Sequence, residues 1–142
     1  MKITICGSMN FAREMDKTAK ELEVLGHTVF LPEFVKEFIN GKLSWELGSL
    51  NKEERAERKK EYNLIKKHWE RIKKSDAILV LNYEKNGIKN YIGANTFLEM
   101  GFAHILNKKI YLLNELPKFD YLLEEIKAIQ PIIINGDLSK IK

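Results

Sequence analysis

The segment 76–82 constrains the fold of this chain more than any other, because it is apolar at nearly every position. Between Asp76 and Asn82 stand Ala, Ile, Leu, Val and Leu without interruption. A strand with one solvent-exposed face alternates apolar and polar side chains, whereas a strand covered on both faces reads as a continuous apolar run. We therefore expect this segment to form the central strand of a parallel sheet.

Four further strands are expected around the central one, with helices between them. The strands cover residues 2–6, 27–31, 109–113 and 131–134. Apolar residues at helical spacing predict helices over about 12–25, from 51 to the low seventies, over 96–106 and over 120–128. This alternation is typical of an α/β doubly wound sheet. We predict one domain over residues 1–142, flavodoxin-like, with strand order 2-1-3-4-5 and helices on both faces.

Composition and charge narrow the class of protein. Hydrophobic residues make up 44% and charged residues 31% of the chain, as in ordinary globular proteins. No apolar run approaches the roughly 20 residues of a membrane-spanning helix, and the first residues lack the pattern of a signal peptide. Cys6 is the only cysteine, which excludes an internal disulfide and favours a reducing compartment. We expect a cytoplasmic protein without a membrane partner.

The net charge of +4 comes from 24 basic and 20 acidic residues. A modest positive surplus favours anionic ligands such as nucleotides. The two signs interleave, as in residues 53–61, which is typical of a solvated helix face. Because neither a basic stripe nor a recognition motif is present, we expect no binding to nucleic acid.

The sheet order predicts where a ligand would bind. In an open parallel sheet, ligands bind at the carboxyl ends of the strands where the strand order reverses. Residues 7–10, residues 82–83 and the start of the helix carrying Glu99 are expected to meet there. The first of these segments matches neither a P-loop nor G-x-G-x-x-G.

The loop after the first strand has two interpretations. Gly7 allows close backbone approach, Ser8 offers a hydroxyl, and Arg13 offers a bidentate phosphate contact. In the alternative, the loop is a tight turn with Ser8 as a helix cap and Arg13 in solvent.

Glu99 also has two interpretations. An ionised carboxylate near a helix N-terminus suits a glycosyl-transferring nucleophile. Thr96-x-x-Glu99 is also the spacing of a capping box, in which Glu99 bonds back to the backbone N–H of Thr96. The local spacing by itself favours the cap.

No metal or cofactor site is predicted. His27, His68 and His104 are widely separated and show no metal-ligand spacing, and Cys6 is expected in the core. The segment 33–50 has a poor pattern and is expected to be the mobile element of the chain, acting as a lid. Trp45 has two interpretations: it is a packing residue, or it stacks on a base when this segment closes over the site.

Three segments together resemble one enzyme family: Ile5–Met9, Ser75–Val80 and Gly93–Ala103. From Met1 to about Asn114 the chain resembles the nucleoside 2-deoxyribosyltransferase superfamily, which includes deoxynucleoside monophosphate N-glycosidases. The resemblance implies a flavodoxin-like sheet and cleavage or exchange of an N-glycosidic bond, with Glu99 as nucleophile. It also implies that Gly7 and Ser8 hold the sugar 5′ end or its phosphate, with Arg13 beside them.

The chain departs from the family pattern at three positions. His68 stands where the family often has an aspartate, Gly93 where a serine or aspartate is common, and Asn10 where the monophosphate glycosidases have an arginine. These departures keep open a second function, a nucleotide-binding or sensing domain without turnover. The resemblance further implies a homo-oligomer, with the region around Asn114 contributing to a neighbouring site. The predicted substrate-binding residues are Gly7, Ser8, Asn10, Arg13, Asn82, Gly93, Asn95 and Thr96.

Overall fold

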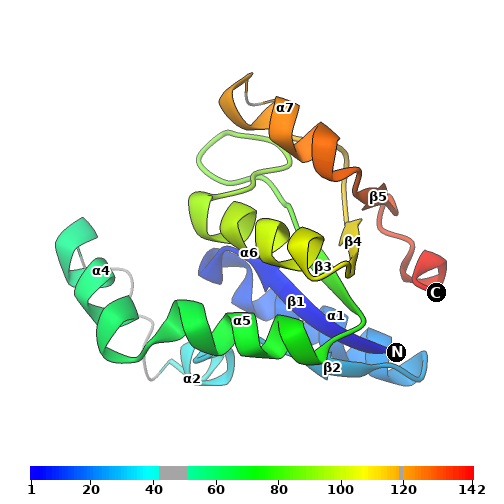
Figure 1. Ribbon diagram of the computed structural model, residues 1–142. Helices are drawn as coiled ribbons and strands as arrows, with labels where there is room; N and C mark the ends of the chain where they lie inside the picture. The colour runs from blue at the N-terminus through cyan, green and yellow to red at the C-terminus, as the bar shows by residue number, and fades with distance from the viewer. Residues whose placement is uncertain (42–50, 119) are drawn as a thin grey trace.

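The computed structural model describes residues 1–41, 51–118 and 120–142. Five parallel strands form one sheet in the order β2-β1-β3-β4-β5 (Figure 1). The strands are β1 (Lys2–Gly7), β2 (Thr28–Phe30), β3 (Ala77–Leu81), β4 (Lys109–Leu112) and β5 (Ile132–Ile133). This confirms the predicted flavodoxin-like sheet and its strand order.

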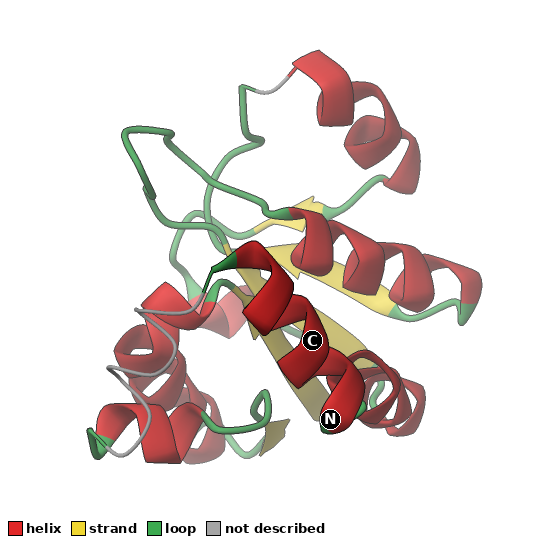
Figure 2. Cartoon of the chain, turned by 90° about the vertical axis from the view of Figure 1, so that its left-hand side faces the viewer, coloured by secondary structure: helices red, strands yellow, loops and turns green. Residues whose placement is uncertain are grey.

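Helices cover both faces of the sheet (Figure 2). On one face, Ile3 and Ile5 of β1 pack with α1 (Ala12–Val24) and α2 (Val35–Ile39). On the other face, Cys6 lies in a second core with α5 (Leu64–Lys74), α6 (Ala94–Ile105) and α7 (Asp120–Ile129). Successive side chains of a strand point to opposite faces, so Cys6 faces α5 and α6 because Ile5 faces α1.

The central strand is β3, as its apolar sequence predicts. All five of its residues are buried, and it pairs with β1 on one side and β4 on the other. The order of the strands reverses between β1 and β3, whose register ends at the pair Gly7 and Leu81. The two chain segments that leave these strands therefore start side by side.

The helix expected from residue 51 onward is divided into α4 (Lys52–Glu61) and α5. Asn51 caps α4 through a reciprocal capping box with Glu54, as predicted. The break falls at Asn63, whose φ of 52° is left-handed. Asparagine tolerates this conformation better than most residues, so the chain turns there and α4 extends beyond the carboxyl ends of β1 and β3 (Figure 1).

Residues 33–41 hold the short helix α2, in a segment without a helical pattern. Trp45 and the remainder of the expected lid lie outside the described residues. Two short 3-10 helices, Met9–Phe11 and Leu138–Lys140, complete the described elements. None of the helices in the described ranges is long and apolar enough to cross a lipid bilayer.

Candidate functional site

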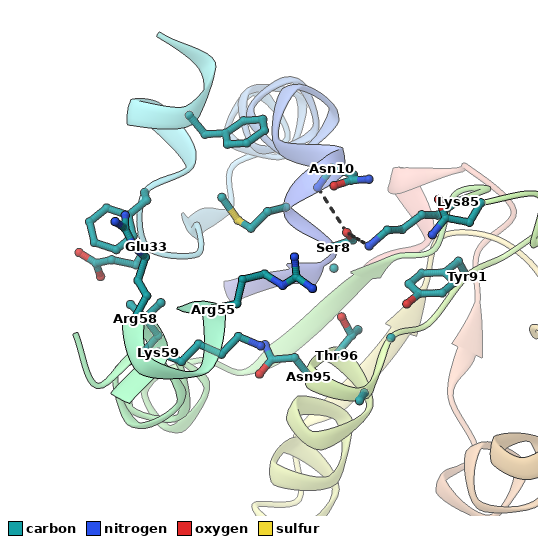
Figure 3. Close-up of a pocket in the computed structure, with 18 residues that line it drawn as sticks. Ser8, Asn10, Glu33, Arg55, Arg58, Lys59, Lys85, Tyr91, Asn95 and Thr96 are labelled. Atoms are coloured by element: carbon teal, nitrogen blue, oxygen red, sulfur yellow. Dashed lines mark hydrogen bonds between the residues drawn. The ribbon is translucent and has the colours of Figure 1, made fainter. Parts of the chain in front are cut away.

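A cavity of about 630 Å³ opens at the carboxyl ends of β1 and β3 (Figure 3). This is the place that the reversal of strand order predicts for a ligand. Its walls come from the turn after β1, the segment after β2, α4, the loop after β3 and the start of α6. The polar and charged lining residues are Ser8, Asn10, Glu33, Arg55, Arg58, Lys59, Lys85, Asn86, Tyr91, Asn95 and Thr96.

The turn after β1 brings backbone close to the floor of this cavity. A Cβ atom on Gly7 would stand 3.0 Å from the carbonyl oxygen of Leu81 and 3.1 Å from Cε of Met15. These contacts are tighter than nine in ten real Cβ contacts, and the φ of Gly7 is 156°, which residues with a side chain rarely adopt. The close pairing of β1 with β3 therefore favours glycine here. The hydroxyl of the next residue, Ser8, is thereby placed at the cavity wall.

Ser8 has the cap role foreseen in one interpretation and also faces the cavity. Its Oγ accepts a hydrogen bond from the backbone N–H of Asn10 at 3.3 Å. The same Oγ accepts a hydrogen bond from Nζ of Lys85 at 3.0 Å. Lys85 stands in the loop after β3, so the contact joins the two loops that flank the reversal of strand order (Figure 3).

Positive charge in the cavity comes mainly from α4. Arg55, Arg58 and Lys59 line the cavity from this helix, and Figure 3 shows Arg55 extending toward Ser8. Burial lowers the pKa of Lys85, and the positive charge of Arg55 lowers it further. An anion bound beside Lys85 and Arg55 would offset this repulsion.

The sequence does not single out these α4 residues, because their stretch looks like a solvated helix face. Their spacing of i, i+3 and i+4 places them on one side of the helix, and only the docking of α4 shows that this side faces a cavity. Arg13, by contrast, is exposed and does not line the cavity. The structure thus brings Ser8 together with Arg55 and Lys85 rather than with Arg13.

Glu99 lies at the floor of a smaller adjoining cavity of about 110 Å³, which shares Gly7, Lys59 and Asn95 with the larger one. Its side chain is 6% exposed. The amide nitrogen of Asn95 donates to Oε1 of Glu99 at 2.8 Å. Among the described residues, Oε2 has no hydrogen-bond partner. Burial raises the pKa of Glu99 to about 8.

Two more side chains surround the Glu99 carboxyl group. His68 of α5 places Nε2 at 3.6 Å from Oε1 of Glu99, and Cys6 of β1 places Sγ at 3.4 Å from the same nitrogen. Burial, and secondarily the charge of Arg71, lower the pKa of His68 to about 4. Burial and the neighbouring Glu99 raise the pKa of the Cys6 thiol. The contact of His68 with Glu99 therefore joins neutral groups at neutral pH.

These three residues are the types that bind metal ions. Sγ of Cys6, Nε2 of His68 and a carboxylate oxygen of Glu99 all lie within 4.8 Å of one another. Their separation along the sequence hides this proximity, which is why the spacing of the histidines predicts no metal site.

The capping interpretation of Glu99 is wrong. Helix α6 begins at Ala94 with Gly93 as its N-cap, two residues earlier than expected. Glu99 is consequently in the second turn, beyond the reach of the first free N–H groups. Its side chain instead enters the space between β1 and α5, where it contacts His68.

The other predicted site residues divide into two groups. Gly93, Asn95 and Thr96 line the larger cavity at the start of α6. Asn82 does not line it: the Asn82 side chain is buried and bonds to the backbone of Asn114 and Glu115. It therefore ties the end of β3 to the segment after β4.

Several solved structures resemble the chain, among them two enzymes. One is a 2-deoxyribosyltransferase from Bacillus psychrosaccharolyticus, with a TM-score of 0.54 and 21% identity; the match covers 88% of this chain and 81% of that chain. The other is a CMP N-glycosidase from Clostridium botulinum, with a TM-score of 0.52 and 16% identity, covering 95% and 90%. The chain has the same fold as these two enzymes.

This finding confirms, for the fold, the resemblance seen in the sequence. No protein-family model and no curated protein sequence matches the chain. One fold supports many chemistries. The side chains around the two cavities therefore determine which reaction this chain can carry out.

Proposed function

We propose that this chain cleaves or transfers the N-glycosidic bond of a nucleoside or nucleoside 5′-monophosphate, with Glu99 as the nucleophile. The observation that carries the proposal is a buried carboxyl group at the floor of a small cavity, next to a larger cavity lined by cations. The two enzymes that share the fold, a deoxyribosyltransferase and an N-glycosidase, support the same class of reaction.

The geometry around Glu99 suits attack by one defined oxygen. Asn95 holds Oε1 through a hydrogen bond of 2.8 Å, while Oε2 has no partner among the described residues. In the proposed step, a carboxylate oxygen bonds to the anomeric carbon and the carbon–nitrogen bond breaks, so its electron pair leaves with the base. At neutral pH the Glu99 carboxyl group is protonated, because burial raises its pKa to about 8. Its proton passes to the departing base as the new carbon–oxygen bond forms. Water or a second base then displaces the carboxylate from the sugar.

The larger cavity suits the 5′ end of the substrate. Ser8 and Lys85 offer a hydroxyl and an ammonium group in contact with each other, and Arg55 extends toward them from α4 (Figure 3). A phosphate accepts charge-assisted hydrogen bonds from such groups. These residues favour the monophosphate over the free nucleoside.

Chromatographic detection of released base tests the proposal. The purified chain is incubated with a panel of ribonucleosides, deoxyribonucleosides and their 5′-monophosphates. We expect base release from at least one monophosphate and none from Glu99→Gln. The exposed residue Glu124 on α7 provides a matched control, because Glu124→Gln removes an equal charge outside the cavities. If Glu99→Gln released base at the wild-type rate, Glu99 would not be the nucleophile.

A nucleotide-binding domain without turnover is the second candidate. It is favoured by His68, which places a neutral imidazole beside Glu99 where the family often has an aspartate. Calorimetric binding of a monophosphate, with no base released by any compound of the panel, would select this function.

Two further predictions accompany the proposal. A homo-oligomer would appear in light scattering as a species larger than the 16.6 kDa chain.

A location in the cytoplasm stays a prediction that rests on the single cysteine.

A further inference from the structure

We propose that Cys6, His68 and Glu99 form a binding site for one divalent transition-metal ion, with Zn²⁺ the best match to the three donors. The residues come from β1, α5 and α6 and lie close together, and two of them, His68 and Glu99, line the smaller cavity. All three residues are buried, with exposed fractions of 0%, 5% and 6%. The inference does not depend on the proposed N-glycosidic activity, since it uses only the positions of these donors.

The distances between the donor atoms fit tetrahedral coordination. Sγ of Cys6 is 3.4 Å from Nε2 of His68, and this nitrogen is 3.6 Å from Oε1 of Glu99. Bonds of about 2.3 Å to sulfur and about 2.0–2.1 Å to nitrogen or oxygen separate neighbouring tetrahedral ligands by roughly 3.3–3.6 Å. Two of the three donor separations already lie near these values, and the third is no longer than 4.8 Å.

The charges of the donors also match a divalent ion. A thiolate and a carboxylate together carry two negative charges, and a neutral imidazole adds none. On binding, the S–H bond of Cys6 breaks, its proton passes to solvent, and a sulfur–metal bond forms; a proton on Glu99 leaves in the same way. The resulting site is neutral, which limits the cost of burying it.

The Glu99 carboxyl group supplies an independent indication of a missing partner. Its Oε2 is buried and makes no hydrogen bond within the described residues. A buried polar atom without a partner is costly, and coordination of an ion through Oε2 would give this atom a partner. The combination of a soft thiolate with imidazole and carboxylate favours Zn²⁺ over Mg²⁺ or Ca²⁺, which prefer oxygen donors alone.

Three protein donors leave the fourth position of the ion open. His68 and Glu99 line the smaller cavity, which shares Gly7, Lys59 and Asn95 with the larger cavity. An ion bound at this site is coordinated by the Glu99 carboxylate, which is then not available as a nucleophile. Metal binding and attack by Glu99 on a sugar therefore exclude each other, and the ion would act as an inhibitor of the proposed reaction.

Titration of the metal-free chain with Co²⁺ tests the site. Because Cys6 is the only cysteine, a sulfur-to-cobalt charge-transfer band in the near ultraviolet reports on this residue alone. We expect the band to saturate at one ion per chain, to disappear when Zn²⁺ is added, and to accompany a higher melting temperature. Absence of the band at a large excess of Co²⁺ would overturn the proposal.

Matched variants separate this site from adventitious binding. Loss of a partner that only orients a ligand costs about 10–100-fold in metal affinity, so His68→Gln, which removes a ligand, should cost at least about 100-fold. The exposed His104 on α6 is the control, and His104→Gln should leave the titration unchanged. If far-ultraviolet circular dichroism shows that His68→Gln does not fold, Glu99→Gln takes its place with the same expected loss. Equal affinity of the ligand variant and the control would contradict the site.

The spectroscopic measurement contains no substrate, so its outcome is distinguishable from that of the base-release assay. A cobalt–thiolate band without base release supports the metal site and leaves the glycosidic function unsupported. Base release without the cobalt–thiolate band contradicts the metal site and leaves the proposed glycosidic function supported.

Discussion

Nζ of Lys85 donates a hydrogen bond of 3.0 Å to Oγ of Ser8, and this contact ties the loop after β3 to the turn after β1. The two residues are neighbours because β1 and β3 are paired and parallel, so both strands deliver their carboxyl ends to the same edge. Burial and the nearby Arg55 lower the pKa of Lys85. An anionic group bound between these residues would offset the repulsion of the two cations.

Lys85→Met should weaken the binding of a nucleoside 5′-monophosphate more than that of the nucleoside. Hydrogen bonds to charged groups contribute about 1.5–3 kcal/mol, so affinity for the monophosphate should fall by roughly 10–100-fold. Isothermal titration calorimetry with both ligands measures the difference. Lys89→Met is the matched control, because Lys89 is exposed and lies outside the cavity lining. Equal losses for nucleoside and monophosphate would place the phosphate elsewhere.

Arg55 and Arg13 allow a direct comparison of the tertiary site with the local sequence interpretation. Arg55→Ala should lower affinity for the monophosphate by about tenfold or more, since its side chain extends into the cavity (Figure 3). Arg13→Ala should leave this affinity unchanged, because Arg13 is exposed and outside the cavity. Isothermal titration calorimetry on the two variants in parallel measures both affinities. A loss of affinity for the monophosphate in Arg13→Ala alone would show that Arg13, and not Arg55, binds the phosphate.

Glu99→Gln should abolish base release while leaving the fold intact. Glutamine keeps a carbonyl oxygen for the hydrogen bond from Asn95, but an amide is a poor nucleophile toward an anomeric carbon. The substitution does not destabilise helix α6 through loss of a cap, because Glu99 does not cap this helix. Thermal unfolding and base release are measured on the same preparation. A melting temperature many degrees below that of the wild type would show that the carboxyl group has a structural role instead.

The ion pair of Glu33 with Arg71 predicts a pH-dependent contribution to stability. Hydrogen bonding to Arg71 lowers the pKa of Glu33 below its usual value of 4.5. A lowered pKa in the folded state stabilises the protein above the unfolded pKa, and this contribution is lost as the pH falls through the folded pKa. Both side chains are about 30% exposed, so we expect Glu33→Gln to cost only about 1 kcal/mol at neutral pH.

Denaturant unfolding at neutral pH and again well below pH 4.5 measures this contribution. The difference between wild type and Glu33→Gln should shrink toward zero in acid. Glu37→Gln on α2 controls for the loss of a charge, because Glu37 is exposed. A Glu33→Gln deficit that stays constant with pH would indicate lost packing rather than a lost ion pair.

The sequence by itself determined the sheet and the place of the site. A continuous apolar run marks β3 as a doubly covered strand, and the strand–helix alternation leaves few topologies open. The residues that follow helices α1 and α6 are local features of the same kind: Gly26 and Asn107 both adopt positive φ. These features depend on neighbours a few residues away, and such local patterns are present in the sequence.

Only the tertiary structure decided what Glu99 and α4 do. The spacing of Thr96 and Glu99 suits a cap, but the helix starts earlier and the carboxyl group packs against His68 and Cys6 instead. The basic side of α4 looks solvated until its docking places Arg55 at the cavity. Burial, charge and reactivity of a side chain are set by groups brought from distant parts of the chain, and local spacing does not contain that information.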